Sequence, residues 1–223
     1  MVQYGKYVFV NCWSYQNRIL NALNSFTVTF ANLFLKPDMT AVAFFGAYFK
    51  AQHMIVMTVN GLIQGTLPVM SFNYGAGNGQ RVRETFRILF ISCLTGSMLV
   101  WAVCMLFPGA VAGMFTPDAE LSSYTAWAMR IYMAASGIFG IQIACQQSFV
   151  ALGQAKVAIF LALLRKVILL IPLILLLPRL GIFENAAFAV FLAEPVADTL
   201  AVCTTAAMFF ARFGRLTAGA ENA

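Results

Sequence analysis

Six long apolar stretches, separated by short polar breaks, constrain the fold of this 223-residue chain more than any other feature. A helix needs about 20 mostly apolar residues to cross the hydrocarbon core of a bilayer. The six stretches are each about that long and cover, approximately, residues 17–35, 41–70, 86–108, 122–151, 157–178 and 186–210. We therefore expect an all-α integral membrane protein folded as a bundle of six transmembrane helices.

The composition supports a membrane protein and argues against a soluble enzyme or binding module. Hydrophobic residues make up 61% of the chain and charged residues only 10%, and the mean hydropathy is +0.81. Soluble domains have about 45–50% apolar and about 25% charged residues. A chain with so few polar side chains cannot cover an apolar core of this size in water, so the lipid bilayer is its expected surrounding.

The polar breaks divide the chain into an N-terminal segment, the bundle and a tail. Residues 1–16 are only partly apolar and fit either an interfacial segment or the start of the first helix. No cleavable signal peptide is evident, so the first helix would act as its own insertion signal. The six-helix unit spans residues 17–212, and residues 213–223 form a polar tail. Pro68, near the end of the second helix, predicts a kink or an early stop.

The charge distribution predicts the orientation in the membrane. With six helices, one side of the membrane holds the basic residues of two loops and the tail: Arg81, Arg83, Arg87, Lys156, Arg212 and Arg215. The opposite loops hold Lys36 and Arg179, which four acidic residues balance. Cytoplasmic loops are enriched in Lys and Arg. We therefore expect a multi-pass protein of the inner or plasma membrane with both termini in the cytoplasm, and no nucleic-acid partner despite the net charge of +6.

The glycines at positions 75, 77 and 79 do not predict a phosphate-binding loop. A dinucleotide fingerprint needs a preceding strand, and here a membrane helix precedes the glycines. The sequence also lacks the Walker, HExxH and GxSxG patterns, and it contains one histidine, His53. We expect a tight cytoplasmic turn between two helices, with no cofactor, metal or catalytic site. An intramembrane enzyme is the least favoured of the functions that we consider.

Charged residues inside the predicted helices are the first candidates for function, because such residues usually face the bundle interior or a water-filled cavity. Glu194 and Asp198 are four residues apart and therefore share one helix face. Arg165 and Lys166 lie at a similar depth in the preceding antiparallel helix. One interpretation is a structural ion pair between Glu194 or Asp198 and Arg165 or Lys166. The other is a carboxylate that carries a proton or cation through a transport cycle.

Further polar residues mark a possible substrate or cation pathway. Lys50 and Gln52 lie in the second predicted helix, where Lys50 either extends toward the interface or lines a cavity. Gln142 and Gln146 share a face of the fourth helix and either line a polar cavity or bond to neighbouring helices. The Gly61-xxx-Gly65 spacing predicts close contact with another helix.

A series of short motifs gives the chain a family resemblance. These motifs are TAVAFFGAYFKAQ (40–52), GLIQGTLP (61–68), FNYGAGN (72–78) followed by Arg81-Val, MFTPDAEL (114–121), ALGQAK (151–156), LRKVILLIP (164–172) and AEPVAD (193–198). The set resembles the multidrug and toxic compound extrusion (MATE) transporters, in particular their C-terminal six-helix lobe. The resemblance covers about residues 20–212 in the family's order and spacing. Each motif alone is weak, and the ordered set is specific.

The resemblance implies one lobe of a twelve-helix secondary antiporter, not an enzyme, that exports lipophilic cationic drugs in exchange for Na+ or H+. The partner would be a second six-helix lobe, from the same gene product or from another copy of the chain. The resemblance also marks a cytoplasmic loop signature, made up of Gln64, Pro68, Asn73, Tyr74, Gly75, Asn78 and Arg81.

Two departures from the family leave the coupling site open. Some members bind the coupling cation through acidic residues on the first and fourth helices of this lobe, and those helices contain no Asp or Glu here. Other members use the N-terminal lobe. The cation site then lies outside this chain or falls to Glu194 and Asp198. Alternatives to the antiporter lobe are an inactive truncated membrane protein and a half-size transporter that acts as a dimer.

Overall fold

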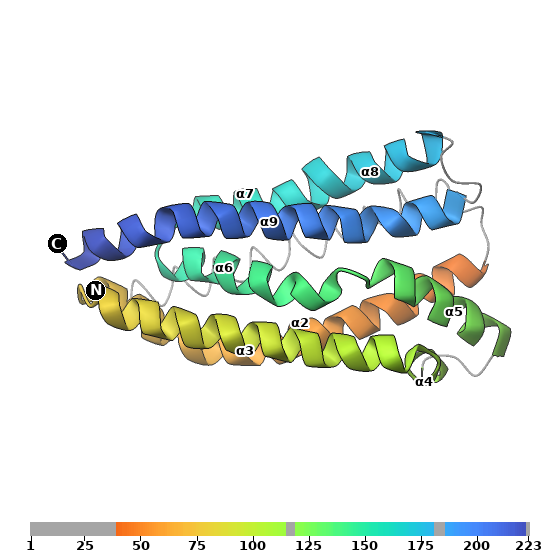
Figure 1. The fold of residues 1–223 in the computed structure, drawn as a ribbon, viewed down its shortest axis with the longest axis horizontal. Helices are drawn as coiled ribbons and strands as arrows, with labels where there is room; N and C mark the ends of the chain where they lie inside the picture. The colour runs from red at the N-terminus through yellow and green to blue at the C-terminus, as the bar shows by residue number, and fades with distance from the viewer. Residues whose placement is uncertain (1–38, 115–118, 181–185, 222–223) are drawn as a thin grey trace.

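A computed structural model describes residues 39–114, 119–180 and 186–221, and every regular element in these ranges is helical (Figure 1). The elements are α2 (Met39–Gly75), α3 (Gly79–Leu106), α4 (Pro108–Gly113), α5 (Ala119–Tyr132), η1 (Ser136–Ile138), α6 (Phe139–Ala151), α7 (Ala155–Leu163), η2 (Leu164–Leu170), α8 (Ile171–Leu176), η3 (Leu177–Leu180) and α9 (Ala186–Glu221). The predicted all-α membrane fold is confirmed. The N-terminal segment 1–16 and the predicted first helix, 17–35, lie outside the described residues.

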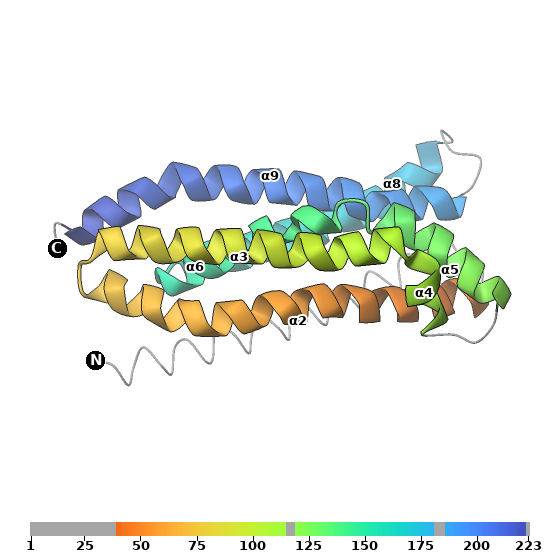
Figure 2. The ribbon, with the colours of Figure 1, turned by 60° about the horizontal axis from the view of Figure 1, so that its bottom comes forward.

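Four of the described helical segments are long and apolar enough to cross a membrane. They are Gln52–Gly75, Gly79–Leu106, Ala155–Leu180 and Phe188–Ala218. A fifth span exists if α5 and α6 are counted together, although the two segments are bent by 57° relative to one another. The long helices run side by side along the length of the molecule (Figures 1 and 2).

Helix α9 is the most buried of the described membrane-length helices. Of its membrane-length stretch 61% is buried, against 22% for α3, because α9 packs on α6, η2, α5 and α3. Near its C-terminal end, Phe209 packs on two other helices, with ring centroids 4.5 Å from Phe86 and 5.0 Å from Phe149. Phe213 stacks on Phe209 at 4.7 Å. This aromatic cluster joins α3, α6 and α9 at one end of the molecule.

The turn between α2 and α3 is much shorter than the sequence predicts. Helix α2 continues through Pro68 to Gly75, and α3 begins at Gly79 instead of near residue 86. Gly77 has a φ of 76°, and Asn78 N–H donates to the Asn73 carbonyl at 2.9 Å. This glycine C-cap satisfies the last carbonyls of α2 and reverses the chain within three residues.

Most of the residues in the cytoplasmic loop signature are therefore helical, and the predicted break between residues 70 and 86 is corrected to a three-residue turn; Gln64 and Pro68 lie within the second helix, as predicted. Five of the signature residues, Gln64, Pro68, Asn73, Tyr74 and Gly75, lie in α2, and Arg81 lies in α3. Only Asn78 belongs to the turn. The polar and glycine content of residues 71–85 suggests a loop, whereas the single left-handed residue Gly77 is sufficient to close the turn.

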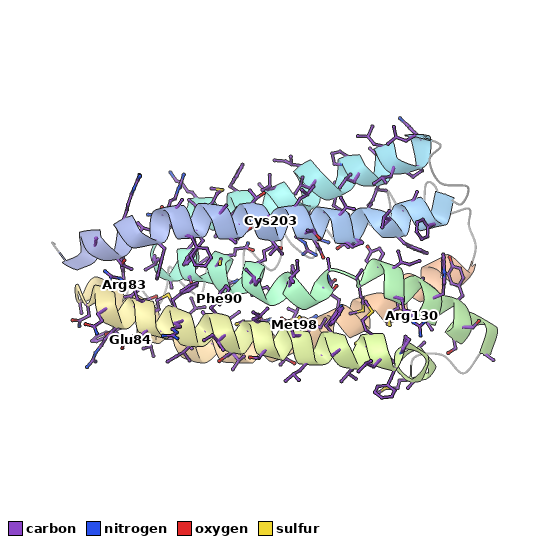
Figure 3. All side chains as sticks on the ribbon, in the orientation of Figure 1. Arg83, Glu84, Phe90, Met98, Arg130 and Cys203 are labelled. Atoms are coloured by element: carbon purple, nitrogen blue, oxygen red, sulfur yellow. The ribbon has the colours of Figure 1, made fainter. Side chains whose placement is uncertain are left out.

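The α6–α7 turn uses the same device and brings basic residues to the same end of the molecule. Gly153 has a φ of 75°, and Gln154 N–H donates to the Phe149 carbonyl at 2.8 Å. Both turns lie at the end where α9 terminates (Figure 2). There Arg83 of α3 donates from Nε to Thr217 Oγ1 of α9 at 3.1 Å, and Figure 3 shows Arg83 at this end of α3.

The fourth predicted helix, 122–151, is broken in the structure. Helix α5 ends at Tyr132, and α6 begins at Phe139 after the 3₁₀ turn η1. Side chains of α3 bond to two backbone carbonyls at this break. Trp101 Nε1 donates to the Met133 carbonyl at 2.9 Å, and Ser97 Oγ donates to the Gly137 carbonyl at 2.9 Å. Non-helical backbone inside a membrane protein is tolerated where such buried partners are available.

Glycines allow α3 to approach the break closely. A Cβ atom added at Gly140 would lie 2.4 Å from the Cys93 carbonyl oxygen, and one at Gly137 would lie 2.9 Å from Met98 Sδ. By contrast, a Cβ at Gly61 or Gly65 would have nothing within 4 Å. The expected close contact of the Gly61-xxx-Gly65 pair is therefore absent among the described residues, and the close helix contact lies between α3 and the α5–α6 break.

We expect Gly140→Ala to destabilise the protein by about 1–3 kcal/mol, since the added methyl group overlaps the backbone of α3. Gly61→Ala is the matched control, because it also replaces a helical glycine but its added methyl group meets no described neighbour within 4 Å. The measurement is the thermal unfolding midpoint of the purified chain in detergent. Equal midpoints for the two variants would contradict the close packing at the break.

Candidate functional site

Four buried charged side chains meet between η2 and α9. Arg165 Nε lies 2.6 Å from Asp198 Oδ1, and Arg165 Nη2 lies 3.2 Å from Glu194 Oε1. Lys166 Nζ lies 3.1 Å from the same Glu194 oxygen. None of the four residues is more than 5% exposed. We call Arg165, Lys166, Glu194 and Asp198 the charge cluster; its ion pairs are among those considered from the sequence.

Local backbone geometry brings the two cations to the same side. Residues 164–170 form a π-helix, which has more residues per turn than an α-helix, so neighbouring side chains are separated by a smaller angle. Arg165 and Lys166 can therefore both reach α9. On α9, the four-residue spacing directs Glu194 and Asp198 to one face. Pro195 lies between them and removes one backbone donor from the helix.

The break between α5 and α6 contributes two further residues to the site. Tyr132, the last residue of α5, donates from its hydroxyl to Glu194 Oε2 at 3.2 Å. Phe139, the first residue of α6, has its ring centroid 4.3 Å from the Arg165 guanidinium carbon, a cation–π distance. Neither residue was predicted from the sequence. The only signal for them was the Ser136-Gly137 pair with Gly140, which marks a weak point in the predicted helix.

The charge cluster has a formal sum of zero when both carboxylates are ionised. An isolated charge at the centre of a bilayer costs about 2.5–3.5 kcal/mol on insertion scales, and opposite charges at hydrogen-bond distance offset that cost. Among the residues placed in the structure, no group of three or more His, Cys, Asp or Glu side chains is arranged to hold a metal ion. The geometry fits both interpretations from the sequence, a structural ion pair and a carrier.

Gln52, Gln142 and Gln146, the other predicted pathway residues whose side chains are described, take no part in the hydrogen bonds described for the charge cluster. Gln146 Nε2 donates to the Ala158 carbonyl of α7 at 3.0 Å. Gln142 is buried, and its Oε1 atom has no hydrogen-bond partner within the described ranges. Gln52 is half-buried in α2. The backbone of Lys50 lies in α2, and its side chain lies outside the described part of the chain.

A second polar feature lies on the surface of α2. His53 and Gln64 are exposed and Asn60 is half-buried. Their spacings of seven and four residues place the three side chains on one face of the helix. We call these residues the α2 polar stripe. Polar side chains in a membrane span usually face another helix or a water-filled cavity instead of lipid. We therefore expect a helix or water against the α2 polar stripe, and the described residues do not provide either.

Comparison with known protein families shows to which family the chain belongs. The MatE family model matches residues 17–176, well over half of the chain. The chain belongs to the MatE family. The family resemblance inferred from the motifs is thus confirmed, and the chain is related to membrane transporters and not to enzymes.

Two curated relatives show how much of a MatE protein this chain represents. It is 24% identical over 163 residues to a protein named FAD transporter from Shewanella oneidensis, covering 73% of this chain and 35% of that protein. It is 24% identical over 195 residues to the multidrug export protein MepA from Staphylococcus aureus, covering 85% of this chain and 41% of that protein. The chain spans less than half the length of these relatives.

Solved structures agree in fold and in coverage. The structure of a MATE transporter in a straight conformation superposes with a TM-score of 0.81 at 15% identity, covering 94% of this chain and 47% of that one. The MATE multidrug transporter DinF-BH is 32% identical, with a TM-score of 0.69, covering 81% of this chain and 39% of that one. The MatE chain therefore folds like about half of a MATE transporter.

We expect Arg165→Met to destabilise the bundle strongly, by about 3–5 kcal/mol, because the substitution leaves a buried carboxylate without its cationic partner. Lys156→Met is the matched control, since Lys156 is exposed and lies at the α6–α7 turn. Membrane yield and the thermal midpoint in detergent measure the effect. A midpoint for Arg165→Met as high as that for Lys156→Met would contradict the importance of the charge cluster for stability.

Proposed function

We propose that this chain forms one six-helix lobe of a secondary antiporter that exports lipophilic cationic compounds in exchange for Na+ or H+. The observation that carries the proposal is the combination of near-complete coverage of this chain and about half coverage of MATE transporter structures. One relative is named as a multidrug export protein and another as an FAD transporter. Multidrug export fits the family motifs, whereas transport of a dinucleotide has no supporting residue on the described part of the chain.

The α2 polar stripe supports the need for a second lobe. The described helices leave His53 and Gln64 exposed and Asn60 half-buried, and contact with acyl chains would be unfavourable for these polar groups. A second lobe beside α2 would cover the stripe or enclose a water-filled cavity with it. Gly61 and Gly65 lie in the same part of α2, and no described residue comes within 4 Å of a Cβ added at either position, so another helix would be able to approach closely there.

The second lobe would come from the remainder of a longer gene product or from a second copy of this chain. A half-size transporter acting as a dimer is therefore the alternative to a partner lobe of different sequence, and an inactive truncated protein is the third possibility. We place both termini in the cytoplasm, because the two glycine turns and the end of α9 bring the basic residues to one end of the molecule.

We expect the chain alone to leave the accumulation of a fluorescent lipophilic cation unchanged in cells that lack their own efflux pumps. A lobe without its partner encloses no pathway across the membrane, so we expect no efflux of the dye. The measurement is dye accumulation, combined with the native mass of the purified chain in detergent. The control is a complete MATE transporter expressed at the same membrane level.

The combined outcomes separate the alternatives. A monomer without efflux agrees with a lobe that needs a different partner. A dimer with gradient-dependent efflux would favour the half-size transporter. Efflux by a monomer would contradict the requirement for a second lobe.

A further inference from the structure

We propose that the charge cluster is a proton-binding site, in which Asp198 accepts one proton and thereby loosens the break between α5 and α6. The inference deepens the proposed function, because it assigns H+ as the ion bound in this lobe. Proton binding itself is a property of this chain, so it is measurable without any transport.

The charge cluster suits a proton and not a metal ion. Glu194 Oε1 already lies 3.1 Å from Lys166 Nζ and 3.2 Å from Arg165 Nη2. Asp198 Oδ1 lies 2.6 Å from Arg165 Nε. A sodium ion at either carboxylate would stand within a few ångströms of these cations and be repelled by them. A proton needs one oxygen lone pair and no coordination shell.

Asp198 is the better acceptor of the two carboxylates. Glu194 accepts hydrogen bonds from Arg165, Lys166 and Tyr132. Within the described residues, Asp198 has one donor, Arg165 Nε. A proton from water would bind the second oxygen of Asp198, Oδ2, which converts the carboxylate into a neutral carboxylic acid. In this first step Arg165 would keep its contact with Glu194; the rearrangement at the break would follow from the changed net charge.

Charge balance explains why this step changes the structure. The charge cluster sums to zero before the proton binds and to +1 afterwards. A net charge buried among apolar helices is unfavourable unless water or an opposite charge reaches it. Protonation of Asp198 therefore favours an arrangement in which the charge cluster opens to water. Acidic conditions populate the open arrangement and alkaline conditions the closed one.

The break between α5 and α6 is the element that can respond. Tyr132 on one side of the break bonds to Glu194, and Phe139 on the other side lies against Arg165. The π-helix η2 packs on α9, in which Pro195 directly follows Glu194. Within the break, the Met133 carbonyl accepts a hydrogen bond from Trp101 Nε1 of α3. The fluorescence of the Trp101 indole can therefore report a structural change at the break.

The acid and base groups that face Glu194 and Asp198 are Arg165 and Lys166 of η2 and Tyr132 of α5. Helix α8 and η1 contain no titratable residue, and the only one in α6 is Cys145. The other charged side chains described in the elements packed on α9 are exposed and comprise His53, Arg81, Arg83, Glu84, Arg87, Arg130 and Arg179. Figure 3 shows Arg83, Glu84 and Arg130 in their helices. None of these exposed groups takes part in the hydrogen bonds described for the charge cluster.

The test uses the purified full chain in lipid nanodiscs, with Trp13→Phe and Trp127→Phe, so that Trp101 is the only tryptophan. Trp101 fluorescence is recorded from mildly alkaline to mildly acidic pH without sodium. We expect one transition with the steepness of a single proton. Asp198→Asn should abolish the transition and give the acid-form signal at all pH values, because this variant carries the +1 charge permanently.

A second variant distinguishes an effect of the net charge of the charge cluster from misfolding of the Asp198→Asn protein. Asp198→Asn combined with Lys166→Gln restores a net charge of zero, so we expect the closed, alkaline-form signal at every pH. Glu84→Gln is the matched control, because Glu84 is an exposed carboxylate that accepts a bond from Gln80 at 3.2 Å; its titration should match that of the parent protein. If Asp198→Asn does not accumulate in membranes, the neutral double variant still decides the question.

Three results would overturn the proposal. The first is the absence of a transition in the parent protein, and the second is a transition that persists in the double variant. The third is a shift of the transition when Na+ replaces K+ at constant ionic strength, which would indicate a metal-ion site. Because no dye is involved, a failure of the proposed efflux function would leave these results unaffected, and the two proposals fail independently.

Discussion

The mutual neutralisation of four buried charges is the interaction on which this bundle depends. Arg165 and Lys166 bring two positive charges into the apolar interior, and Glu194 and Asp198 of α9 balance them at hydrogen-bond distances. Removing one partner of such a group leaves a charge that neither lipid nor apolar side chains can solvate. Helix α9 is the most buried of the long spans that the structure describes, and its packing against η2 encloses a balanced set of buried charges.

The irregular backbone of the bundle gathers around these charges. The π-helix supplies both cations, Pro195 separates the two carboxylates, and the α5–α6 break places Tyr132 and Phe139 against them. Such irregularities need polar partners in a membrane. Trp101 and Ser97 of α3 provide them at the break, and Gly137 and Gly140 allow α3 to come close enough. Helix α3 thus stabilises the break beside the charge cluster, although it contributes no charged residue to the cluster.

Local rules made much of the fold predictable. Apolar stretches of membrane length indicated the helices, and the four-residue spacing of Glu194 and Asp198 was enough to place both on one helix face. The predictions failed where a single interaction outweighed a local trend. Residues 71–75 look like a loop by composition, yet they continue α2 because Gly77 alone closes the turn. The fourth span looks continuous, yet donors from α3 stabilise its break.

By itself, the sequence determined that the chain is a helical membrane protein of the MATE type, and which ionisable residues lie within its spans. The helical membrane fold and the ionisable residues in the spans follow from hydropathy and spacing along single segments, whereas the MATE type follows from the family resemblance of the ordered motifs; neither needs knowledge of which helices are neighbours. Only the tertiary structure decided that Arg165 bonds to both carboxylates, that Tyr132 and Phe139 complete the site, and that α3 supports the break. Each of these contacts joins residues from different helices, and their distances depend on how the helices pack against one another.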